Sequence, residues 1–146
     1  EMINEALTPM LKDQSLQVVN LMGRIEDVEE FNDPNTVKVV VTPEGKAIYF
    51  SREPIPTRKK GFEEVPMLKQ ICIIPFRRDY LLKFNNTPET PLERIESVDM
   101  MRVIESGDSV QMVITEAPSI GVDTQNDLDT VTRLMTNDSL MQRYLP

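Results

Sequence analysis

Asp123 stands at a junction where a carboxylate can serve more than one purpose. It follows the pair Gly121-Val122 and precedes an expected helix whose apolar face carries Leu128, Val131, Leu134 and Met135. Asp123 or Thr124 can cap that helix by accepting hydrogen bonds from the first-turn amides, and Asp127 places negative charge near the positive end of the helix dipole. One capping residue is enough for a helix, and both Asp123 and Thr124 could serve. Asp123 is therefore free to have a second role.

Two further charged residues could bind a ligand. Arg52 leads from an expected hairpin into a proline-rich loop, and its planar guanidinium can hold a carboxylate or a phosphate. Asp99 lies four residues after Ile95 and seven after Leu92, so one continuous helix would place it among apolar residues. A buried carboxylate is costly unless it is paired or bound. Asp99 therefore either belongs to a site or faces a partly wet groove.

Other candidates are weaker. Arg58, Lys59 and Lys60 form a basic cluster in the long loop 51–66, and such a cluster is either a solvated face or a substrate contact. Cys72 has isoleucine neighbours, so we expect it to pack in the core. The sequence contains no Gly-rich phosphate loop, no nucleophile elbow and no metal-binding cysteine pattern.

Alternating strand and helix patterns must position these residues. We expect helices at 1–13, 77–84, 91–106 and after 123, strands at 15–25, 68–76 and 109–115, a polar connection at 27–35, and a hairpin at 36–51. The hairpin turn is Thr42-Pro43-Glu44-Gly45, which fits a type I turn. Thr90, Pro91 and Glu93 mark the start of the third helix, and Gly107 marks its end.

This order predicts an α/β fold with a mostly parallel sheet and one antiparallel hairpin. Ligands in such sheets bind beyond the carboxyl ends of the strands. Asp123 follows the strand expected at 109–115, so the topology places it near such an end.

Composition narrows the function classes. The 146 residues carry a net charge of -8, which disfavours non-specific nucleic-acid binding. There is no histidine, so a metal would be a hard cation held by carboxylates, Mg²⁺ or Ca²⁺. A single cysteine excludes an internal disulfide framework. No apolar run reaches membrane-spanning length and no signal peptide is visible, so we expect a cytoplasmic protein.

Three segments occur in a characteristic order: FNDPNTVKVVVTPEGKAIYFSREPIP, TPLERIESVDMMRVIESG and GVDTQNDLDTV. Together they resemble the 3-deoxy-manno-octulosonate cytidylyltransferase family over nearly the whole chain. The resemblance implies a Rossmann-like mixed sheet of the nucleotide-diphospho-sugar-transferase type, with a β-hairpin dimerisation arm and a homodimer. It also implies transfer of CMP from CTP to an acidic sugar, release of pyrophosphate, and Mg²⁺ as cofactor.

The resemblance assigns roles residue by residue. Asp123 matches the family's second Mg²⁺ carboxylate, and Arg52 matches an arginine that binds the acidic sugar. Lys59, or Arg58 with a one-residue slip, matches a second basic contact. The chain resembles only the C-terminal part of one cytidylyltransferase domain, with residues 37–66 in its dimerisation and substrate region. We therefore expect the N-terminal nucleotide-binding half to be absent from this chain, and the isolated chain not to turn over CTP.

The sequence departs from the family at sugar-contact positions. The family strand reads Arg-His-x-Gly-Ile-Tyr, whereas this chain has Lys69 to Ile74, so Gln70 replaces the histidine and Ile74 the tyrosine. A Glu-Gln pair on the helix becomes Asp99-Met100. Two alternatives therefore stay open. One is a related cytidylyltransferase acting on a different acid, either another acidic sugar or a phosphonate. The other is a non-catalytic dimerisation or interaction domain.

Overall fold

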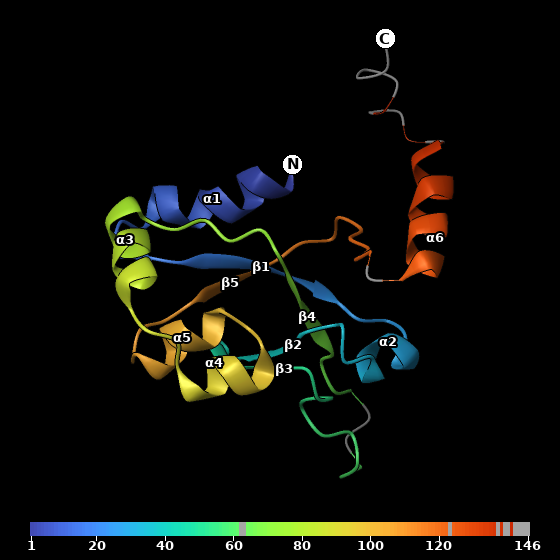
Figure 1. The fold of residues 1–146 in the computed structure, drawn as a ribbon, viewed down its shortest axis with the longest axis horizontal. Helices are drawn as coiled ribbons and strands as arrows, with labels where there is room; N and C mark the ends of the chain where they lie inside the picture. The colour runs from blue at the N-terminus through green and yellow to red at the C-terminus, as the bar shows by residue number, and fades with distance from the viewer. Residues whose placement is uncertain (62–63, 123, 137, 139–140, 142–146) are drawn as a thin grey trace.

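A five-stranded mixed sheet forms the centre of the fold (Figure 1), with strand order β3-β2-β4-β1-β5. The computed structural model describes residues 1–61, 64–122, 124–136, 138 and 141. The strands are β1 Val19–Arg24, β2 Lys38–Val41, β3 Ala47–Ser51, β4 Leu68–Ile71 and β5 Gln111–Ile114. A mixed sheet is what the sequence predicted.

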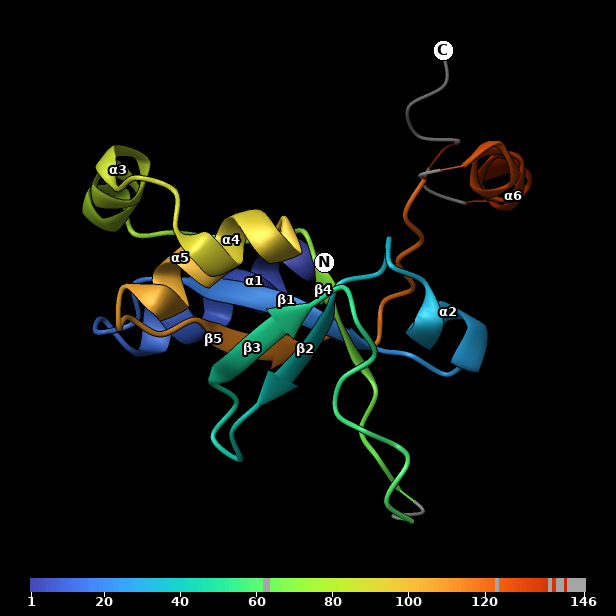
Figure 2. The same cartoon turned by 60° about the horizontal axis from the view of Figure 1, so that its bottom comes forward.

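Helices cover this sheet unevenly. The described helices are α1 Met2–Lys12, α2 Val28–Asn32, α3 Arg78–Asn86, α4 Pro91–Glu96, α5 Met100–Glu105 and α6 Gln125–Thr136. Helix α1 packs beside β1 and α5 packs beside β3, whereas α6 stands apart from the sheet in both views (Figure 2). No residue of α6 is buried. None of the described helices is long and apolar enough to cross a membrane.

Strand direction differs from the expectation of a mostly parallel sheet. Among the described strands, β1 and β5 run parallel, whereas β1–β4, β2–β3 and β2–β4 are antiparallel. Parallel neighbours need a long crossover, and the chain makes one between β1 and β5. The expectation was wrong because β4 inserts between β2 and β1, which the order of elements along the chain does not reveal.

The core lies mainly between the sheet and the pair α4–α5. Phe50 and Met101 are fully buried there, with Val39, Val103 and Val110. Burying a side chain such as Phe50 contributes roughly 1.5–3 kcal/mol. A second cluster joins Ala6 of α1 to Leu21 and Ile71. Strand β1 is buried on both faces along most of its length.

The hairpin turn does more than join two strands. Gly45 N donates to Thr42 O over 2.9 Å, which confirms the predicted turn, and Gly45 has a positive φ of 78°. The turn also reaches β5, because Met112 N donates to Gly45 O over 2.7 Å and Ala47 N donates to Val110 O over 2.9 Å. The tip of the hairpin is therefore hydrogen-bonded to the opposite edge strand.

Two expected elements were wrong. The segment 27–35 contains α2, whose start is capped by Asp27 accepting from Glu29 N over 3.0 Å and whose Phe31 is buried. The single helix 91–106 is two helices, because Ser97 adopts a left-handed conformation with φ 54°. The bend buries Val98, which one straight helix would not place in the same position.

The predicted boundaries of that helical region are confirmed. Glu93 accepts from Thr90 N over 3.1 Å, with Pro91 in the first turn. Gly107 closes α5 with φ 79°, and its N–H donates to Ile104 O over 3.0 Å. The expected helix at 77–84, the strand at 109–115 and the last helix correspond to α3, β5 and α6.

Candidate functional site

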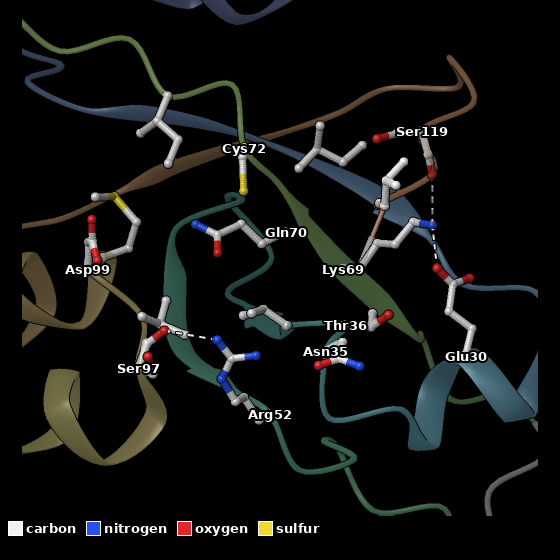
Figure 3. Close-up of a pocket in the computed structure, with 17 residues that line it drawn as sticks. Glu30, Asn35, Thr36, Arg52, Lys69, Gln70, Cys72, Ser97, Asp99 and Ser119 are labelled. Carbon is white, nitrogen blue, oxygen red and sulfur yellow. Dashed lines mark hydrogen bonds and ion pairs between the residues drawn. The ribbon is translucent and has the colours of Figure 1, made fainter. Parts of the chain in front are cut away.

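A cavity of about 480 Å³ lies where segments following β1, β3 and β5 meet β4 (Figure 3). Five of the predicted site residues line it, namely Arg52, Gln70, Ile74, Asp99 and Met100. The other lining residues are Glu30, Asn35, Thr36, Val37, Lys69, Ile71, Cys72, Ser97, Val98, Ser119, Gly121 and Val122. The fold therefore gathers most of the predicted residues from distant parts of the chain into one place.

Arg52 is held at the end of β3 by main-chain oxygens. Its Nε donates to Glu96 O over 2.8 Å, its Nη1 to Pro34 O over 2.8 Å, and its Nη2 to Ser97 O over 3.1 Å (Figure 3). A guanidinium has five N–H donors, so two remain for a ligand. Within the described residues Arg52 forms no ion pair. Its orientation is fixed and its charge is available to an anion.

Glu96 fastens the end of β3 to α4. Its carboxylate accepts from Tyr49 Oη over 3.0 Å, from Ser51 Oγ over 3.1 Å and from Arg52 N over 2.9 Å. Burial, together with this carboxylate, raises the pKa of Tyr49 above its usual value. Sequence analysis missed Glu96, because nothing in a helical segment marks which glutamate turns toward a strand.

Gln70 is oriented by a buried amide beneath it. Its Nε2 donates to Asn20 Oδ1 over 2.7 Å, and Asn20 is fully buried in β1. Asn20 in turn donates to Ile71 O over 2.7 Å and Leu21 O over 2.9 Å. Since one end of the Gln70 amide is held, its oxygen is the end that a ligand hydroxyl can meet.

Lys69 holds the opposite wall of the cavity. Its Nζ pairs with Glu30 Oε1 of α2 and donates to Ser119 O over 3.3 Å (Figure 3). The two side chains are 18% and 33% exposed. This contact places the segment 119–122 beside the cavity. Sequence analysis gave Lys69 no role, although it belongs to the strand motif that differs from the family.

Asp99 and Cys72 correct two expectations. Asp99 is exposed at the start of α5, because the bend at Ser97 turns it away from the apolar side expected for one helix. Cys72 is exposed rather than packed in the core, because β4 ends at Ile71. Met100 is 2% exposed and belongs to both the core and the cavity wall. Together with half-buried Ile74 it makes part of that wall apolar.

The basic loop residues lie elsewhere. Arg58 and Lys59 are exposed in the loop after β3 and do not line the cavity in the part of the chain that the structure describes. A contact between either residue and a substrate stays a prediction.

Asp123 lies outside the described residues, but its neighbours are informative. Gly121 and Val122 line the cavity. Thr124 caps α6, because its Oγ1 accepts from Asp127 N over 3.2 Å while the Asp127 carboxylate accepts from Thr124 N over 2.8 Å. The start of this helix therefore has a cap that does not require Asp123.

The described residues do not form a metal site by themselves. Outside the gaps at 62–63, 123, 137, 139–140 and 142–146, no group of three or more His, Cys, Asp or Glu side chains could hold a metal ion. Glu30 lines the cavity but is paired with Lys69. Any Mg²⁺ at this cavity would need ligands in addition to these described carboxylates.

Ligands in open α/β sheets bind beyond the carboxyl ends of the strands, and this cavity is lined there by Arg52 after β3 and by Ser119, Gly121 and Val122 after β5. Comparison with known families agrees. A family model described as Cytidylyltransferase matches residues 1–114, and the chain belongs to this family.

Curated relatives match over most of the chain. The 3-deoxy-manno-octulosonate cytidylyltransferase of Solibacter usitatus is 41% identical over 132 residues, which are 90% of this chain and 52% of that protein. The enzyme of the same name from Geobacter metallireducens is 39% identical over 140 residues, covering 89% of this chain and 55% of that protein. The chain thus spans about half the length of the curated relatives it matches.

A solved structure shares the fold. It is described as CMP:2-keto-3-deoxy-manno-octonic acid synthetase complexed with CTP, and it superposes with a TM-score of 0.83 at 35% identity. The match covers 92% of this chain and 55% of that one.

Proposed function

We propose that this chain provides the acceptor-binding part of an enzyme that transfers CMP from CTP to an acidic sugar, 3-deoxy-manno-octulosonate or a similar acid. Pyrophosphate is the second product, and the reaction takes place in the cytoplasm. The observation that carries the proposal is the Arg52 guanidinium on the cavity wall, fixed by three main-chain oxygens with two N–H groups left over. Family membership and the names of the relatives support the reaction type.

In this proposal the two remaining N–H groups of Arg52 hold the carboxylate of the acceptor. The cavity of about 480 Å³ falls within the usual size of small-molecule sites. The Gln70 amide oxygen accepts from an acceptor hydroxyl. Holding the acceptor at two points orients its anomeric hydroxyl and removes much of the entropy cost of the reaction.

The acceptor oxygen then attacks the α-phosphorus of CTP. The new P–O bond forms as the bond to the β-phosphate oxygen breaks, so CMP is joined to the sugar, pyrophosphate leaves and the hydroxyl proton is released. The described residues of this chain bind and orient the acceptor, and they include no group that we assign to the proton transfer.

We propose that Asp123 supplies one oxygen ligand to Mg²⁺. The cavity-lining residues immediately before it, and a helix cap that does not depend on it, support this role. Mg²⁺, when bound, would neutralise charge on the triphosphate. We expect Asp123→Asn in the full-length protein to lower turnover by about a hundredfold or more while the melting temperature stays within a few degrees. Asp129→Asn, an exposed change on α6, is the matched control.

To identify the acceptor, the full-length protein is given CTP, Mg²⁺ and each of a panel of acids, and kcat/KM is measured for each acid. We expect an anion to be required, because Arg52 presents a free donor pair. A neutral sugar that reacts as well as any acid would show that the role given to Arg52 is wrong.

A different acid is the second candidate, and the cavity wall favours it. Ile74 and Met100 present apolar surface where the family has polar side chains. Each lost polar contact is worth roughly 0.5–1.5 kcal/mol, which favours a smaller or less hydroxylated acceptor. If 3-deoxy-manno-octulosonate is preferred by a wide margin in the same panel, this candidate is wrong.

We also propose that residues 37–66 contact a second copy of the chain. Ile48 is 53% exposed in β3. A hollow of about 240 Å³ beside β2 and the start of β4 is lined by Val39, Val40, Val41, Pro56, Pro66 and Leu68. Exposed apolar surface of this kind is typical of interfaces. Light scattering of the full-length protein should give a dimer mass, and Ile48→Lys should shift it toward the monomer. A wild-type monomer at working concentration contradicts the proposal.

A further inference from the structure

Lys38 is a buried cation that the proposed reaction does not use. It begins β2 and is fully buried. Its Nζ donates to three main-chain oxygens: Asp33 O at 2.8 Å, Thr36 O at 2.6 Å and Arg52 O at 2.5 Å. An ammonium has three donors, so all of them are used. Burying an ammonium group costs free energy. Because all three donors of Lys38 have partners, we take its burial as a sign of a specific role.

The charge of Lys38 is not neutralised by a direct partner. In the part of the chain that the structure describes, Lys38 forms no ion pair. Burial lowers the pKa of Lys38 below its usual value, and the carboxylates of Asp33, Glu53 and Glu96 oppose this shift only in part. The main-chain oxygens are thus the groups that hold the ammonium directly.

Two of those oxygens belong to residues that line the cavity, Thr36 and Arg52, and the third belongs to Asp33, three residues before Thr36. The turn 33–36 has its carbonyls bound by two cations, since Lys38 takes those of Asp33 and Thr36 and Arg52 Nη1 takes that of Pro34. The turn supplies Asn35 and Thr36 to the cavity, and Val37, which follows it, also lines the cavity. Lys38 also binds the carbonyl of Arg52 itself. One buried ammonium therefore joins the turn to the backbone that carries the guanidinium.

We propose that Lys38 is a positioning residue for acceptor binding. Its ammonium holds the turn 33–36 and the main chain of Arg52 in the arrangement from which the guanidinium meets an acid. This inference rests on the proposed role of Arg52. Without the ammonium, Thr36 O and Arg52 O lose the Lys38 donor, while Asp33 O keeps Thr36 N. The turn is then joined to Arg52 by the bond from Arg52 Nη1 to Pro34 O. We expect both to move more than in the wild type, so that the two free N–H groups of Arg52 are held less firmly.

Cys72 offers a direct readout of cavity occupancy. It is exposed and lines the same cavity, so a bound acid should shield its thiol. The full-length protein is treated with iodoacetamide at increasing concentrations of 3-deoxy-manno-octulosonate, and alkylation of the Cys72 peptide is followed by mass spectrometry. The acid concentration that halves the alkylation rate measures binding without requiring turnover.

Lys38→Met keeps the length of the side chain and removes the charge and the donors. We expect it to raise the half-protecting acid concentration about tenfold or more, while the KM for CTP stays within about twofold. Lys46→Met is the matched control, because Lys46 is an exposed lysine of the same hairpin. The control should protect Cys72 at the wild-type acid concentration.

The outcomes separate this inference from the proposed function. If folded Lys38→Met protects Cys72 at the wild-type acid concentration, even with a lower melting temperature, Lys38 is only structural and the inference is wrong. If no acid protects Cys72 in the wild type, the acid-binding role of Arg52 is wrong and the inference fails with it.

If Lys38→Met does not fold, Lys38→Gln is the second test, since glutamine keeps two donors without the charge. We expect about threefold weaker protection from it, and equal protection overturns the inference.

Discussion

The two walls of the cavity differ in the number of contacts that hold them in place. The hairpin wall joins Lys38, Arg52 and Glu96 in one network of buried or half-buried groups, with every donor of the Lys38 ammonium used. In the described part of the chain, the facing wall at 119–122 is tied to the sheet by a bond of 3.3 Å from Lys69 Nζ to Ser119 O, and Lys69 is itself paired with Glu30 of α2. The helix that follows it buries no residue.

This difference separates two tasks. A group that orients an acceptor must be held rigidly, and the hydrogen-bond network of the hairpin wall holds Arg52 in this way. A segment that approaches a second substrate can be held by fewer contacts within the protein, because the bound substrate adds further contacts to it. The contrast predicts that changes under the hairpin wall alter stability strongly, whereas changes at the facing wall act on binding and depend on salt.

The largest effect should come from Arg102, which ties α5 to α4 behind the hairpin wall. Its Nε donates to Glu93 Oε2 over 2.8 Å, and the two side chains are 14% and 7% exposed. Arg102→Met leaves the Glu93 carboxylate buried without its partner, so we expect a loss of about 3–5 kcal/mol in the free energy of unfolding. Urea denaturation measures it, with exposed Arg94→Met as control. A loss below about 1 kcal/mol would mean that this pair does not support the wall.

The next effect is a dependence on pH. Hydrogen bonds from Arg102 hold the pKa of Glu93 below its usual value of 4.5 despite burial. The lowered pKa means that this stabilisation is fully present above the unfolded-state pKa and is lost as pH falls through the folded-state pKa. Thermal unfolding of the wild type between neutral pH and pH of about 3 should show this loss. Glu93→Gln should be less stable at neutral pH, with a flatter acid limb. Parallel curves would contradict the assignment.

A smaller effect is expected at the facing wall. Lys69→Met removes a partly buried ion pair, so stability should fall by about 1 kcal/mol or less. Because Ser119 also loses its donor, the KM for CTP should rise several-fold, and the wild type should approach the variant as salt is added. Arg24→Met is the control, since the exposed Arg24–Glu116 pair spans 3.8 Å. An unchanged KM would show that Lys69 does not position this wall.

The smallest effect is expected at Asp99. It is exposed and makes no capping bond at the start of α5, so Asp99→Asn should change the free energy of unfolding by no more than about 0.5 kcal/mol. Thr124→Ala, which removes a formed cap, should cost about 1 kcal/mol. Calorimetry compares the two, and a larger loss for Asp99→Asn would reverse the expected order.

Local signals in the sequence were sufficient where the structure is set by local chemistry. The turn at Thr42–Gly45, the start at Thr90 and Pro91, and the end at Gly107 all depend on neighbouring residues, and each is confirmed. Arg52 was a candidate from its guanidinium and its position as well as from the resemblance, and Gln70 came from the resemblance alone. The fold brings both to one cavity.

What could not be predicted depends on contacts between distant segments. Ser97 takes a left-handed conformation because Val98 and Met101 pack in the core, and no glycine or proline marks that bend. Lys38 opens a strand, where a lysine is usually exposed, and its burial follows from oxygens that only the folded turn 33–36 supplies. The short α2 had a signal in the Asp27 cap, which the acidic composition of the segment concealed.

The closure of the hairpin tip onto β5 has a consequence for anyone who wishes to insert a tag or graft a peptide. A hairpin tip is ordinarily a tolerant site, but a Cβ at Gly45 would stand 2.9 Å from Gln111 Nε2 and 3.2 Å from Met112 O. Lengthening this tip would break the hydrogen bonds that join the two edges of the sheet and would shift β3, which ends at Ser51 next to Arg52. Among the described residues, nothing lies within 4 Å of the Cβ position of Gly61 in the loop after β3, and its φ of +79° favours keeping the glycine. Extra residues next to Gly61, with the glycine kept, should therefore disturb the fold less than extra residues at the hairpin tip.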